Sequence, residues 1–411
     1  MVLHRGHRIG SPQDQAGLTL VELLVAMVVS MLVGIAAVAT SLTFNATQRQ
    51  ALSTGTMSSN LVTSLGGIKA QVSQAGLGFY QDGRYLCLRM NLSVNGTKYY
   101  DNAVFAPLTA SIDVARFDRI GATYADEVLA GARVRLNGSV VSSDTLVNLE
   151  TLLPESLVMP PTSTPTKFRA IMFSALDGSK TCTIKTVTGW APPDVLIGQP
   201  AVLTMAASGK HNQGTFASPV TYNGLSDYVS VLGEVNWWRF RVLDPATGSA
   251  PTGTTAVGNL VVEKPLTNES AVIERDVVAF KMQYGISTGV MSSGIDQWVN
   301  PQNPWDVLDT ADEVGRVRAV RMGLVVRGER ARDRGADSAT CSSTTPDLWV
   351  TGNDGAFTQG GQLALFKGSK QPILLTAPSP SGTDWRCFRY RTAEIVVPMR
   401  NIVYGRQGKL P

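Results

Sequence analysis

The chain has 411 residues, 44% hydrophobic and 17% charged, which is enough folded sequence for one large domain or two small ones. Its formal net charge is only +4, so the sequence gives no support for nucleic-acid binding. The 39 glycines and 21 prolines favour a body rich in turns and strands over a helical bundle.

The N-terminal region joins a polar segment, residues 1–17, to a long apolar run, residues 18–44. The run contains one charged residue, Glu22, and the next charge along the chain is Arg49. A helix over residues 18–44 would be about 40 Å long, which exceeds the roughly 30 Å of a bilayer core. We therefore predict a membrane-spanning helix over this run.

Glu22 discriminates between three interpretations of this helix, because a carboxylate inside an apolar segment costs about 3 kcal/mol. A secretory signal peptide cut after Ala39 would be unusually long, and Glu22 would interrupt its apolar region. A plain membrane anchor would leave Glu22 incidental. Cleavage after Gly17 would instead create a positive amine on Leu18, on the same helix face as Glu22 or beside it in an adjacent subunit. We favour this third interpretation.

Residues 17–24 read Gly-Leu-Thr-Leu-Val-Glu-Leu-Leu and resemble the type IV prepilin signature. The match includes the glycine before the cut, the acidic residue at the fifth mature position and the apolar run that follows. The resemblance implies cleavage after Gly17 by a prepilin peptidase, N-methylation of Leu18 and a role in assembly for Glu22. Phenylalanine is commonest at the first mature position, so Leu18 departs mildly from the family pattern.

Residues 45–75 are predicted to continue the helix as an amphipathic segment, which gives a pilin helix over residues 18–75 with its transmembrane part at 18–44. Apolar residues recur there at helical spacing, and three glycines could kink the helix. These are Leu52, Leu61, Leu65, Ile68 and Val72, and Gly55, Gly66 and Gly67. Two glycines within residues 75–78 supply the stop.

The remaining chain reads as strands. Residues 76–235 alternate short apolar runs with turns and predict an irregular β-rich subdomain. Residues 236–411 show clear period-two patterns, such as Val278, Phe280, Met282 and Tyr284, which predict half-buried antiparallel strands. The expected fold class is therefore α+β: a pilin-like long N-terminal helix followed by a β-rich, mainly antiparallel head.

Parts of the second half resemble the PilW-type minor pilin family more narrowly. The segments are Asp276 to Gly285 (DVVAFKMQYG), Trp305 followed by Arg318 to Arg327 (RAVRMGLVVR), and Phe388 to Asn401 with its FRYR and VVPMRN motifs. The resemblance covers about residues 17–79 and 273–403. The middle, residues 80–235, is interpreted as an insertion relative to shorter members. Many members carry an Asp-rich turn where this chain has Ile286-Ser287-Thr288-Gly289, which argues against a metal there.

Four widely spaced cysteines, Cys87, Cys182, Cys341 and Cys387, form no C-x-x-C pair, so zinc and thioredoxin-like sites are poor interpretations. An even number in an exported body predicts two disulfides. We favour Cys87–Cys182 and Cys341–Cys387 among the three pairings, because each pair then lies within one half of the chain. Four buried reduced thiols remain the alternative.

Little in the sequence suggests catalysis or metal binding. His211 is the only histidine left after removal of residues 1–17, and no G-x-S-x-G elbow accompanies it. We interpret His211 as a solvated loop residue. An acidic cluster could bind calcium but does not fit the EF-hand template. We interpret it as a short helix with Asp306 as N-cap, its other acids being Asp309, Asp312 and Glu313.

Two further groups of residues have a structural and a functional interpretation. A basic stretch could meet an acidic partner subunit, but we favour a strand with a solvated Arg face. The tryptophans could anchor an interface, but in a β-rich body we expect them in the core. The residues are Arg316, Arg318, Arg321, Arg327, Arg330, Arg332 and Arg334, and Trp237, Trp238, Trp298, Trp305, Trp349 and Trp385.

The PilW resemblance implies a structural role: a low-copy minor pilin that starts or caps assembly near the pilus tip, in a pilus used for adhesion and twitching motility. It implies a single-pass inner-membrane protein with a periplasmic head before assembly, and a place in the surface pilus afterwards. The implied partners are other minor and major pilins, the prepilin peptidase, the inner-membrane assembly platform and a tip adhesin. We expect no enzyme activity, cofactor or bound nucleic acid.

Two alternative functions share the same N-terminus. The first is a minor pseudopilin of a type II secretion system, acting as a piston tip. The second is an adhesin or carbohydrate-binding head carried on a pilin stem, with the middle segment supplying the site. The sequence gives neither the head topology nor the order of partners.

Overall fold

The structure is a computed structural model that describes residues 20–81, 84–114, 116–126, 133–151, 169–194, 196, 198–224, 226–252, 257–290, 292, 294–330, 362–366, 373–376 and 388–404. The chain forms two compact units, residues 1–56 and residues 57–411. We describe each unit by itself and refer to the second as the head. The long helix α1 (Leu20–Val72) supplies residues to both units.

Helix α1 continues through all three glycines that could have interrupted it, Gly55, Gly66 and Gly67. Each glycine costs an exposed helix interior about 1 kcal/mol relative to alanine. In the head, that cost is offset because Leu61, Leu65, Ile68 and Val72 are buried on one face, as their helical spacing predicts. Turns follow α1 up to residue 79.

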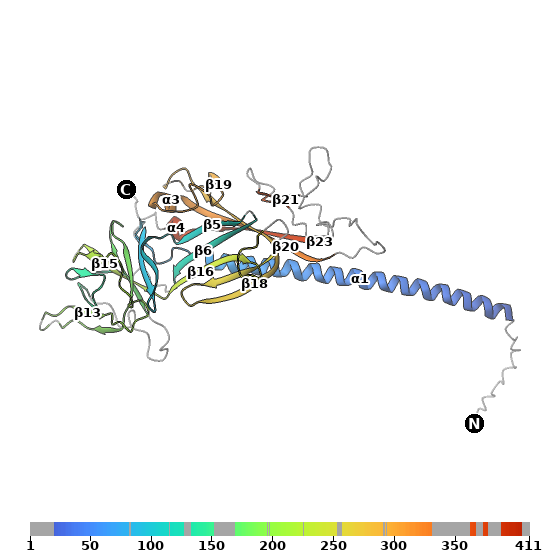
Figure 1. Ribbon diagram of the computed structural model, residues 1–411, viewed down its shortest axis with the longest axis horizontal. Helices are drawn as coiled ribbons and strands as arrows, with labels where there is room; N and C mark the ends of the chain where they lie inside the picture. The colour runs from blue at the N-terminus through green and yellow to red at the C-terminus, as the bar shows by residue number, and fades with distance from the viewer. Residues whose placement is uncertain are drawn as a thin grey trace, which may run out of the picture. The chain divides into compact units, whose positions relative to one another are not determined.

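The largest element of the head is an eight-stranded sheet, antiparallel except for one parallel bridge between Phe117 and Phe280. Its strands, in spatial order, are β23 (Phe388–Pro398), β20 (Val317–Arg330), β18 (Glu269–Ile286), β17 (Gly258–Lys264), β16 (Val235–Leu243), β6 (Phe117–Ala125) and β5 (Leu108–Val114), with β19 (Gln297–Val299) paired to β18. Figure 1 shows most of these strands gathered in one part of the head.

A six-stranded sheet lies in another part of the head (Figure 1). Its order is β4 (Thr97–Val104), β3 (Arg89–Val94), β11 (Cys182–Thr186), β10 (Ala170–Ala175), β15 (Asp227–Gly233) and β7 (Arg133–Arg135). A three-stranded sheet, β12 (Gly189–Ala191), β13 (Ala201–Thr204) and β9 (Leu146–Leu149), lies across the apolar cluster that β10 and β15 share.

Smaller elements complete the described chain. Three two-stranded sheets pair β1 (Tyr80–Gln81) with β2 (Arg84–Tyr85), β8 (Val140–Val141) with β14 (Thr221–Tyr222), and β21 (Gln362–Leu365) with β22 (Ile373–Thr376). Two short helices, α3 (Ala311–Arg316) and α4 (Arg400–Tyr404), flank strands β20 and β23. The expected α+β class, with a long helix followed by a mostly antiparallel head, is confirmed.

The eight-stranded sheet carries the main core on the face that meets α1. Apolar side chains of the helix pack there with alternating residues of the central strands. The members from these elements include Leu61, Leu65, Ile68, Val72, Phe240, Phe280, Met282, Tyr284, Val320, Met322, Leu324 and Val326. The sheet therefore fixes the C-terminal turns of α1 by apolar burial, the dominant favourable term in folding.

The expectation of half-buried strands is wrong for residues 277–286 of β18 and for the part of β20 that pairs with them, because the second face of the sheet is also covered there. Leu365 and Phe366, at the end of β21, lie on that face with Tyr390 of β23. Lys281 and Gln283 are consequently buried as well. The alternation itself is confirmed for β20, whose four alternating apolar residues all belong to the main core.

One residue of the predicted β18 pattern lies on the opposite face from the others. Val278 belongs to the second apolar cluster, whereas Phe280, Met282 and Tyr284 belong to the main core. The register of β18 against β20 shifts between Val277 and Ala279, and Asp276 just before has a φ of 54°. Such a bulge inverts the side-chain parity, which a strict period of two does not anticipate.

The strand pairing bears on the expected organisation of the head into residues 76–235 and 236–411. Strands β5 and β6 come from the first range, yet they pair within the sheet built otherwise from the second. The chain thus forms β3 and β4 of the six-stranded sheet, enters the eight-stranded sheet with β5 and β6, goes back to the six-stranded sheet, and returns to the eight-stranded sheet at Val235. The two ranges share a sheet, which ties the middle of the sequence to its C-terminal part.

Candidate assembly site

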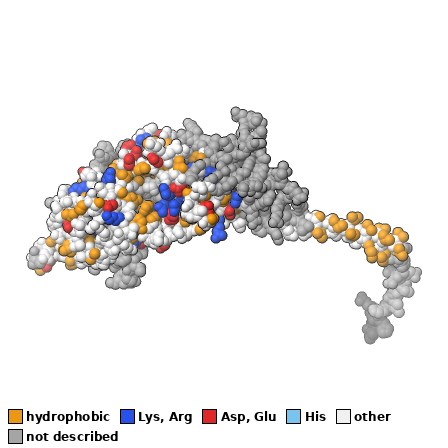
Figure 2. Space-filling model, viewed as in Figure 1, with side chains coloured by type: hydrophobic (Ala, Val, Ile, Leu, Met, Phe, Trp, Pro, Cys, Tyr) orange, Lys and Arg blue, Asp and Glu red, His pale blue; other side chains and the backbone are white. Residues whose placement is uncertain are grey.

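The first unit consists, where described, of helix α1 and exposes a long, mainly apolar surface. Residues Leu20–Ser41 have a mean hydropathy of 2.6 and are long and apolar enough to cross a membrane: 22 residues at about 1.5 Å each give roughly 33 Å. Large apolar side chains there range from 50% exposed at Leu23 to 79% at Leu20. Figure 2 shows this surface as a run of orange side chains along the helix.

Polar side chains within this segment bond back to the helix backbone. The Ser30 hydroxyl donates to the Met27 carbonyl at 2.9 Å, and the Thr40 hydroxyl donates to Ala36 and Ala37 carbonyls at 3.0 and 2.9 Å. Such bonds satisfy hydroxyl groups without water. The segment is therefore suited to an environment made of lipid or of other apolar helices.

Glu22 lies in the first turn of α1. A carboxylate at this position interacts favourably with the positive end of the helix dipole. It is the only charged residue between Leu20 and Ser41. Gly17 and Leu18 lie outside the described residues, so cleavage between them, methylation at Leu18 and the assembly role of Glu22 stay predictions.

The C-terminal end of α1 is held to the head by polar contacts as well as by its apolar face. The Tyr124 hydroxyl and the Gln71 side-chain oxygen are 2.5 Å apart. The Asn401 amide donates to the Gln74 and Ala75 carbonyls at 3.0 and 3.3 Å. These carbonyls lie in the turns that directly follow the helix, where buried backbone acceptors need partners. Gly76, at a φ of 86°, then turns the chain and donates its N–H to Thr123 at 3.0 Å.

Asn401 closes the C-terminal VVPMRN motif, and the sequence did not identify it as a capping residue. Its partners lie more than 320 positions earlier in the chain. No local pattern predicts such a contact, because it depends on α4 being placed beside the end of α1. The motif thus joins the two ends of the head.

Strands β18 and β20, which contain the DVVAFKMQYG and RAVRMGLVVR segments, hold buried charged groups. The Lys281 ammonium on β18 bonds to the Asp118 carboxylate on β6, whose second oxygen accepts the Met282 N–H at 2.9 Å. Asp118 is fully buried, and this desolvation raises the pKa of its carboxyl to about 6, although the Lys281 charge opposes the shift. The pair links two strands that share a single backbone bridge.

The expected solvated Arg face is wrong for Arg318 and Arg321, which are only 3% and 5% exposed. Arg332 and Arg334 lie outside the described residues. The Arg321 guanidinium donates to the Gln283 side-chain oxygen and lies 4.7 Å from the Trp298 ring and 4.3 Å from the Phe366 ring. Contacts of this kind between guanidinium and aromatic rings strengthen when water is excluded. Arg321 therefore serves the core of the head rather than an exposed basic surface.

Arg318 organises the loop that follows β18. Its guanidinium donates to the carbonyls of Gly289, Val290, Ser292 and Gly315 at 2.7–3.0 Å. Burial lowers the pKa of Arg318 to about 10, which leaves it charged at neutral pH. This loop begins with the Ile286-Ser287-Thr288-Gly289 sequence, and arginine binds it through backbone oxygens. Among the described residues, His, Cys, Asp and Glu form no group of three that could hold a metal ion.

The acidic cluster adjoins a short helix, as expected, but Asp306 is not its N-cap. Helix α3 begins after Thr310, whose hydroxyl accepts the Glu313 N–H at 3.2 Å while the Glu313 carboxylate accepts the Thr310 N–H. This is a capping box, and the Thr-x-x-Glu spacing in the sequence was the signal that could have identified it. Trp305 nearby is 8% exposed and contacts Arg316, which confirms a core position for this tryptophan.

His211 is not a solvated loop residue, because it is 2% exposed. Its Nδ1 lies 2.8 Å from the Ser93 carbonyl, and its backbone N–H donates to the Thr186 hydroxyl. Burial lowers the pKa of His211 to about 4, against the opposing effect of the Ser93 bond. The residue holds its loop against β3 and β11.

This burial predicts a pH dependence of head stability. Because the folded pKa of His211 lies below its unfolded value of 6.5, the histidine contributes stability that is present above pH 6.5 and is lost as the pH falls through about 4. The expected loss is about 3 kcal/mol over that window. Urea unfolding of wild type and His211→Gln at pH 7 and pH 4.5 checks this. An unchanged difference between the two proteins at both pH values would contradict it.

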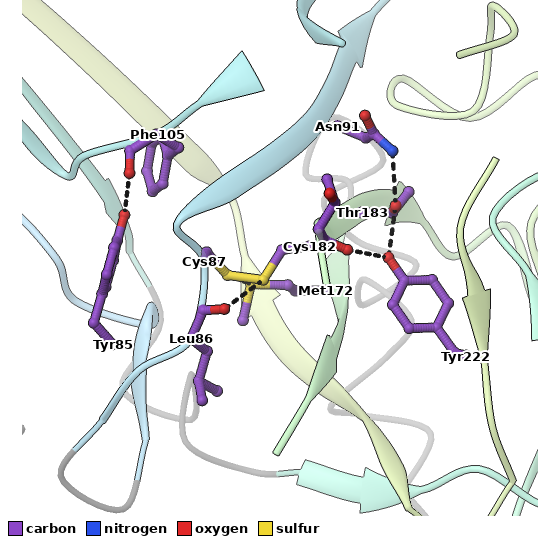
Figure 3. Close-up of a disulfide and its surroundings, with 10 residues drawn as sticks. Tyr85, Leu86, Cys87, Asn91, Phe105, Met172, Cys182, Thr183 and Tyr222 are labelled. Carbon is purple, nitrogen blue, oxygen red and sulfur yellow. Dashed lines mark hydrogen bonds between the residues drawn. A yellow bond between two sulfur atoms is a disulfide. The ribbon is translucent and has the colours of Figure 1, made fainter. Parts of the chain in front are cut away.

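The predicted Cys87–Cys182 disulfide is present, with an S–S distance of 2.02 Å and a Cα–Cα distance of 5.3 Å. Figure 3 shows it between the loop after β2 and strand β11, beside Met172 of β10. Tyr222 lies on the other side of β11, where its hydroxyl donates to the Thr181 carbonyl at 2.6 Å. Both cysteines are fully buried. Cys341 and Cys387 lie outside the described residues.

The disulfide closes a long loop, since its cysteines are 95 residues apart. Loops of this length give about 2–5 kcal/mol of stabilisation, chiefly by restricting the unfolded chain. Replacing both residues in a Cys87→Ala/Cys182→Ala variant should lower the free energy of unfolding by that amount. Urea unfolding followed by tryptophan fluorescence tests it, and an unshifted midpoint would contradict the stabilising role.

Two family models match the chain. Residues 12–38 match the prokaryotic N-terminal methylation motif, and residues 254–401 match PilW, the type IV pilus-assembly protein W. The first match covers the cleavage region and Glu22, and the second covers β17, β18, β20, β23 and Asn401. A search of curated proteins and a search of solved structures found no match. The resemblance drawn from the sequence motifs is confirmed.

Proposed function

We propose that this chain, a PilW-type, type IV pilin-like protein, is a minor pilin. It assembles through α1 and starts or caps a pilus at its tip. The observation that carries the proposal is the continuity of α1. One helix presents an exposed apolar surface at Leu20–Ser41 and buries Leu61, Leu65, Ile68 and Val72 in the head. A structural pilus component needs no catalytic site.

The same apolar surface serves two environments in this proposal. Before assembly it spans the inner membrane with the head in the periplasm. After cleavage between Gly17 and Leu18 by the prepilin peptidase, it leaves the bilayer and packs among the helices of other minor and major pilins. The Leu18 amine then pairs with Glu22 of the same or an adjacent subunit and fixes the register, a use of buried polar contacts attested elsewhere.

The size of the head supports a place at the tip. The unit from Met57 to Pro411 contains an eight-stranded and a six-stranded sheet. A body of this size on every subunit would crowd a repeating shaft, whereas a single copy at the end is free of that constraint. In the proposed organisation residues 1–17 are the leader, 18–75 the pilin helix, and 76–235 and 236–411 the two parts of the head.

Deletion of the gene and complementation test the proposal. We expect loss of surface pili on deletion, restoration by the wild-type gene, and recovery of the protein in sheared pili at low copy relative to the major pilin. Electron microscopy and quantitative mass spectrometry measure both. Normal piliation together with a loss of protein secretion would contradict the proposal and favour a type II secretion pseudopilin.

A further inference from the structure

A polar pocket of about 290 Å³ lies on the eight-stranded sheet where β5, β6 and β16 are neighbours. It is on the face away from α1, because the strand neighbours Ile120 and Phe240 belong to the main core on the other face. Its volume is near the lower limit of small-molecule sites, about 300 Å³, and suits one small ring. The lining residues are Thr109, Ala110, Ser111, Arg119, Trp237, Arg239 and Asp306.

A glycine in the middle of β6 makes room for this pocket. Gly121 is paired with Thr109 on one side and with Arg239 on the other, which places these two residues on one face of the sheet. A Cβ at Gly121 would lie 2.5 Å from the Thr109 hydroxyl oxygen and 3.4 Å from Trp237 Nε1. Glycine within a strand often marks a close approach of other groups. The Thr109 hydroxyl and the Trp237 indole N–H therefore lie over the same point of β6.

The indole ring of Trp237 is held in place by two tyrosines of β4. Its centroid lies 6.0 Å from the Tyr99 ring and 5.7 Å from the Tyr100 ring. The Tyr99 hydroxyl donates to the Pro265 carbonyl at 2.6 Å, which fixes that ring in turn. Trp237 remains only partly buried. It thus gives the pocket a rigid apolar surface that carries one polar donor.

Two arginines are also held in position at the pocket. Arg239 donates through Nε to the Glu263 carboxylate at 2.5 Å. Arg119 donates through Nε and Nη2 to the Ser111 hydroxyl at 3.2 and 3.0 Å. A guanidinium has five N–H groups in a planar fork, so both arginines keep further donors for a ligand. The Asp306 carboxylate at the pocket supplies acceptors.

The charges in and beside the pocket are balanced. Arg239 and Arg241 share the Glu263 carboxylate, and Arg119 lies 3.6 Å from Asp113. The basic residues are Arg119, Arg239 and Arg241, and the acidic ones are Asp113, Glu263 and Asp306. An anion would meet no excess of positive charge here. The pocket instead combines donors and acceptors, which suits an uncharged ligand whose hydroxyl groups both donate and accept.

We propose that this pocket binds one neutral sugar residue of a glycan. The apolar C–H face of the sugar ring packs on Trp237, its hydroxyl groups accept from the guanidinium of Arg239, and they donate to Asp306. A sugar ring has the required combination of one apolar face and a rim of hydroxyl groups. The site belongs to the head alone, so this inference goes beyond the proposed function and does not depend on it.

An array of neutral, sialylated and sulfated glycans tests the proposal. The probe is the full-length protein, fluorescently labelled and kept in a detergent without a sugar headgroup, because such a headgroup would compete for the pocket. We expect binding to glycans that end in a neutral sugar, inhibition by the methyl glycoside of that sugar, and no inhibition by sodium sulfate at matched ionic strength. Binding to no glycan, or to sialylated or sulfated glycans alone, would overturn the proposal.

The chain offers a matched pair of variants that locate the binding. Asp306 and Asp309 are both exposed and lie in one loop, but only Asp306 lines the pocket. We expect Asp306→Ala to weaken binding to the array at least tenfold and Asp309→Ala to leave it at the wild-type level. Unchanged binding by Asp306→Ala, or equal losses with both variants, would overturn the placement of the site.

Removal of the indole tests the apolar part of the site. Trp237→Ala should weaken glycan binding at least tenfold, and Thr109→Val, which keeps the side-chain shape, should weaken it severalfold. Because Trp237 packs on Tyr99 and Tyr100, urea unfolding of both variants shows whether the head is folded under the assay conditions. Wild-type glycan binding by a folded Trp237→Ala protein would contradict the proposal. Should that variant unfold, Thr109→Val decides: wild-type binding by Thr109→Val would then contradict it.

Discussion

Glu22→Ala is expected to reduce surface pili at least tenfold while the protein is still cleaved and inserted in the membrane. Glu22 lies in the first turn of α1 and is the only charge in the apolar segment. A carboxylate in such a segment costs about 3 kcal/mol on insertion scales. Alanine would therefore favour the membrane-inserted state and would remove the group that pairs with the Leu18 amine during assembly.

The measurement compares pili, total protein and mature N-terminus in a deletion strain complemented with wild type, Glu22→Ala or Glu22→Asp. The aspartate variant retains the charge on a shorter side chain and should recover part of the pili. Membrane levels should be equal for all three proteins. Normal piliation with Glu22→Ala would show that the carboxylate has no role in register.

Asp118→Ala is expected to have the largest effect on the stability of the head, about 3–5 kcal/mol. The substitution leaves the Lys281 ammonium buried without its carboxylate and removes the acceptor of the Met282 N–H. Breaking a buried ion pair on one side is costly because the remaining charge has lost its compensation. The contact also supplies most of the polar link between β6 and β18, which share one bridge.

A double variant separates the cost of leaving the Lys281 charge unpaired from the net contribution of the ion pair to stability. Asp118→Ala/Lys281→Met replaces both charges by apolar groups and should recover much of the lost stability, because well-packed apolar residues often substitute for buried pairs. Urea unfolding of the full-length protein in detergent gives the free energies at pH 7. If Asp118→Ala alone unfolds at the wild-type midpoint, the pair is not a structural link.

The parts of the fold that could be predicted from sequence follow local periodicity. Leu61, Leu65, Ile68 and Val72 repeat at helical spacing, and the structure buries all four. The Cys87–Cys182 pairing also followed from sequence, because their even number and their position within one half of the chain favoured it. In both cases the spacing of the residues along the chain is enough to predict the contact.

The missed features depend on contacts that are distant in sequence. His211 is buried because its loop meets Ser93, 118 positions earlier, and the Arg face is buried because Phe366 covers Arg321. Val278 changes face because of a bulge that begins with the positive φ of Asp276. The Thr310 capping box is the exception, since its Thr-x-x-Glu spacing was readable.

The candidate site also has one part that the sequence predicts and one part that depends on contacts distant in sequence. The sequence predicts the assembly segment, because Gly17 and Glu22 stand at the spacing of the prepilin signature that this segment resembles. It does not identify features of the head that exist only when strands distant in sequence meet α1, such as the packing of Phe240 of β16 against Leu65 and Ile68. Asn401 likewise acquires its role at the end of α1 through folding.

The mass of the mature N-terminus tests the central claim most directly. The protein is purified from membranes and from sheared pili, digested, and its N-terminal peptide sequenced by mass spectrometry. Pilin-type processing predicts a peptide that begins at Leu18 and carries one methyl group on its amine. A peptide that begins at Thr40 would mean cleavage by a signal peptidase and release of the head, and would contradict the account.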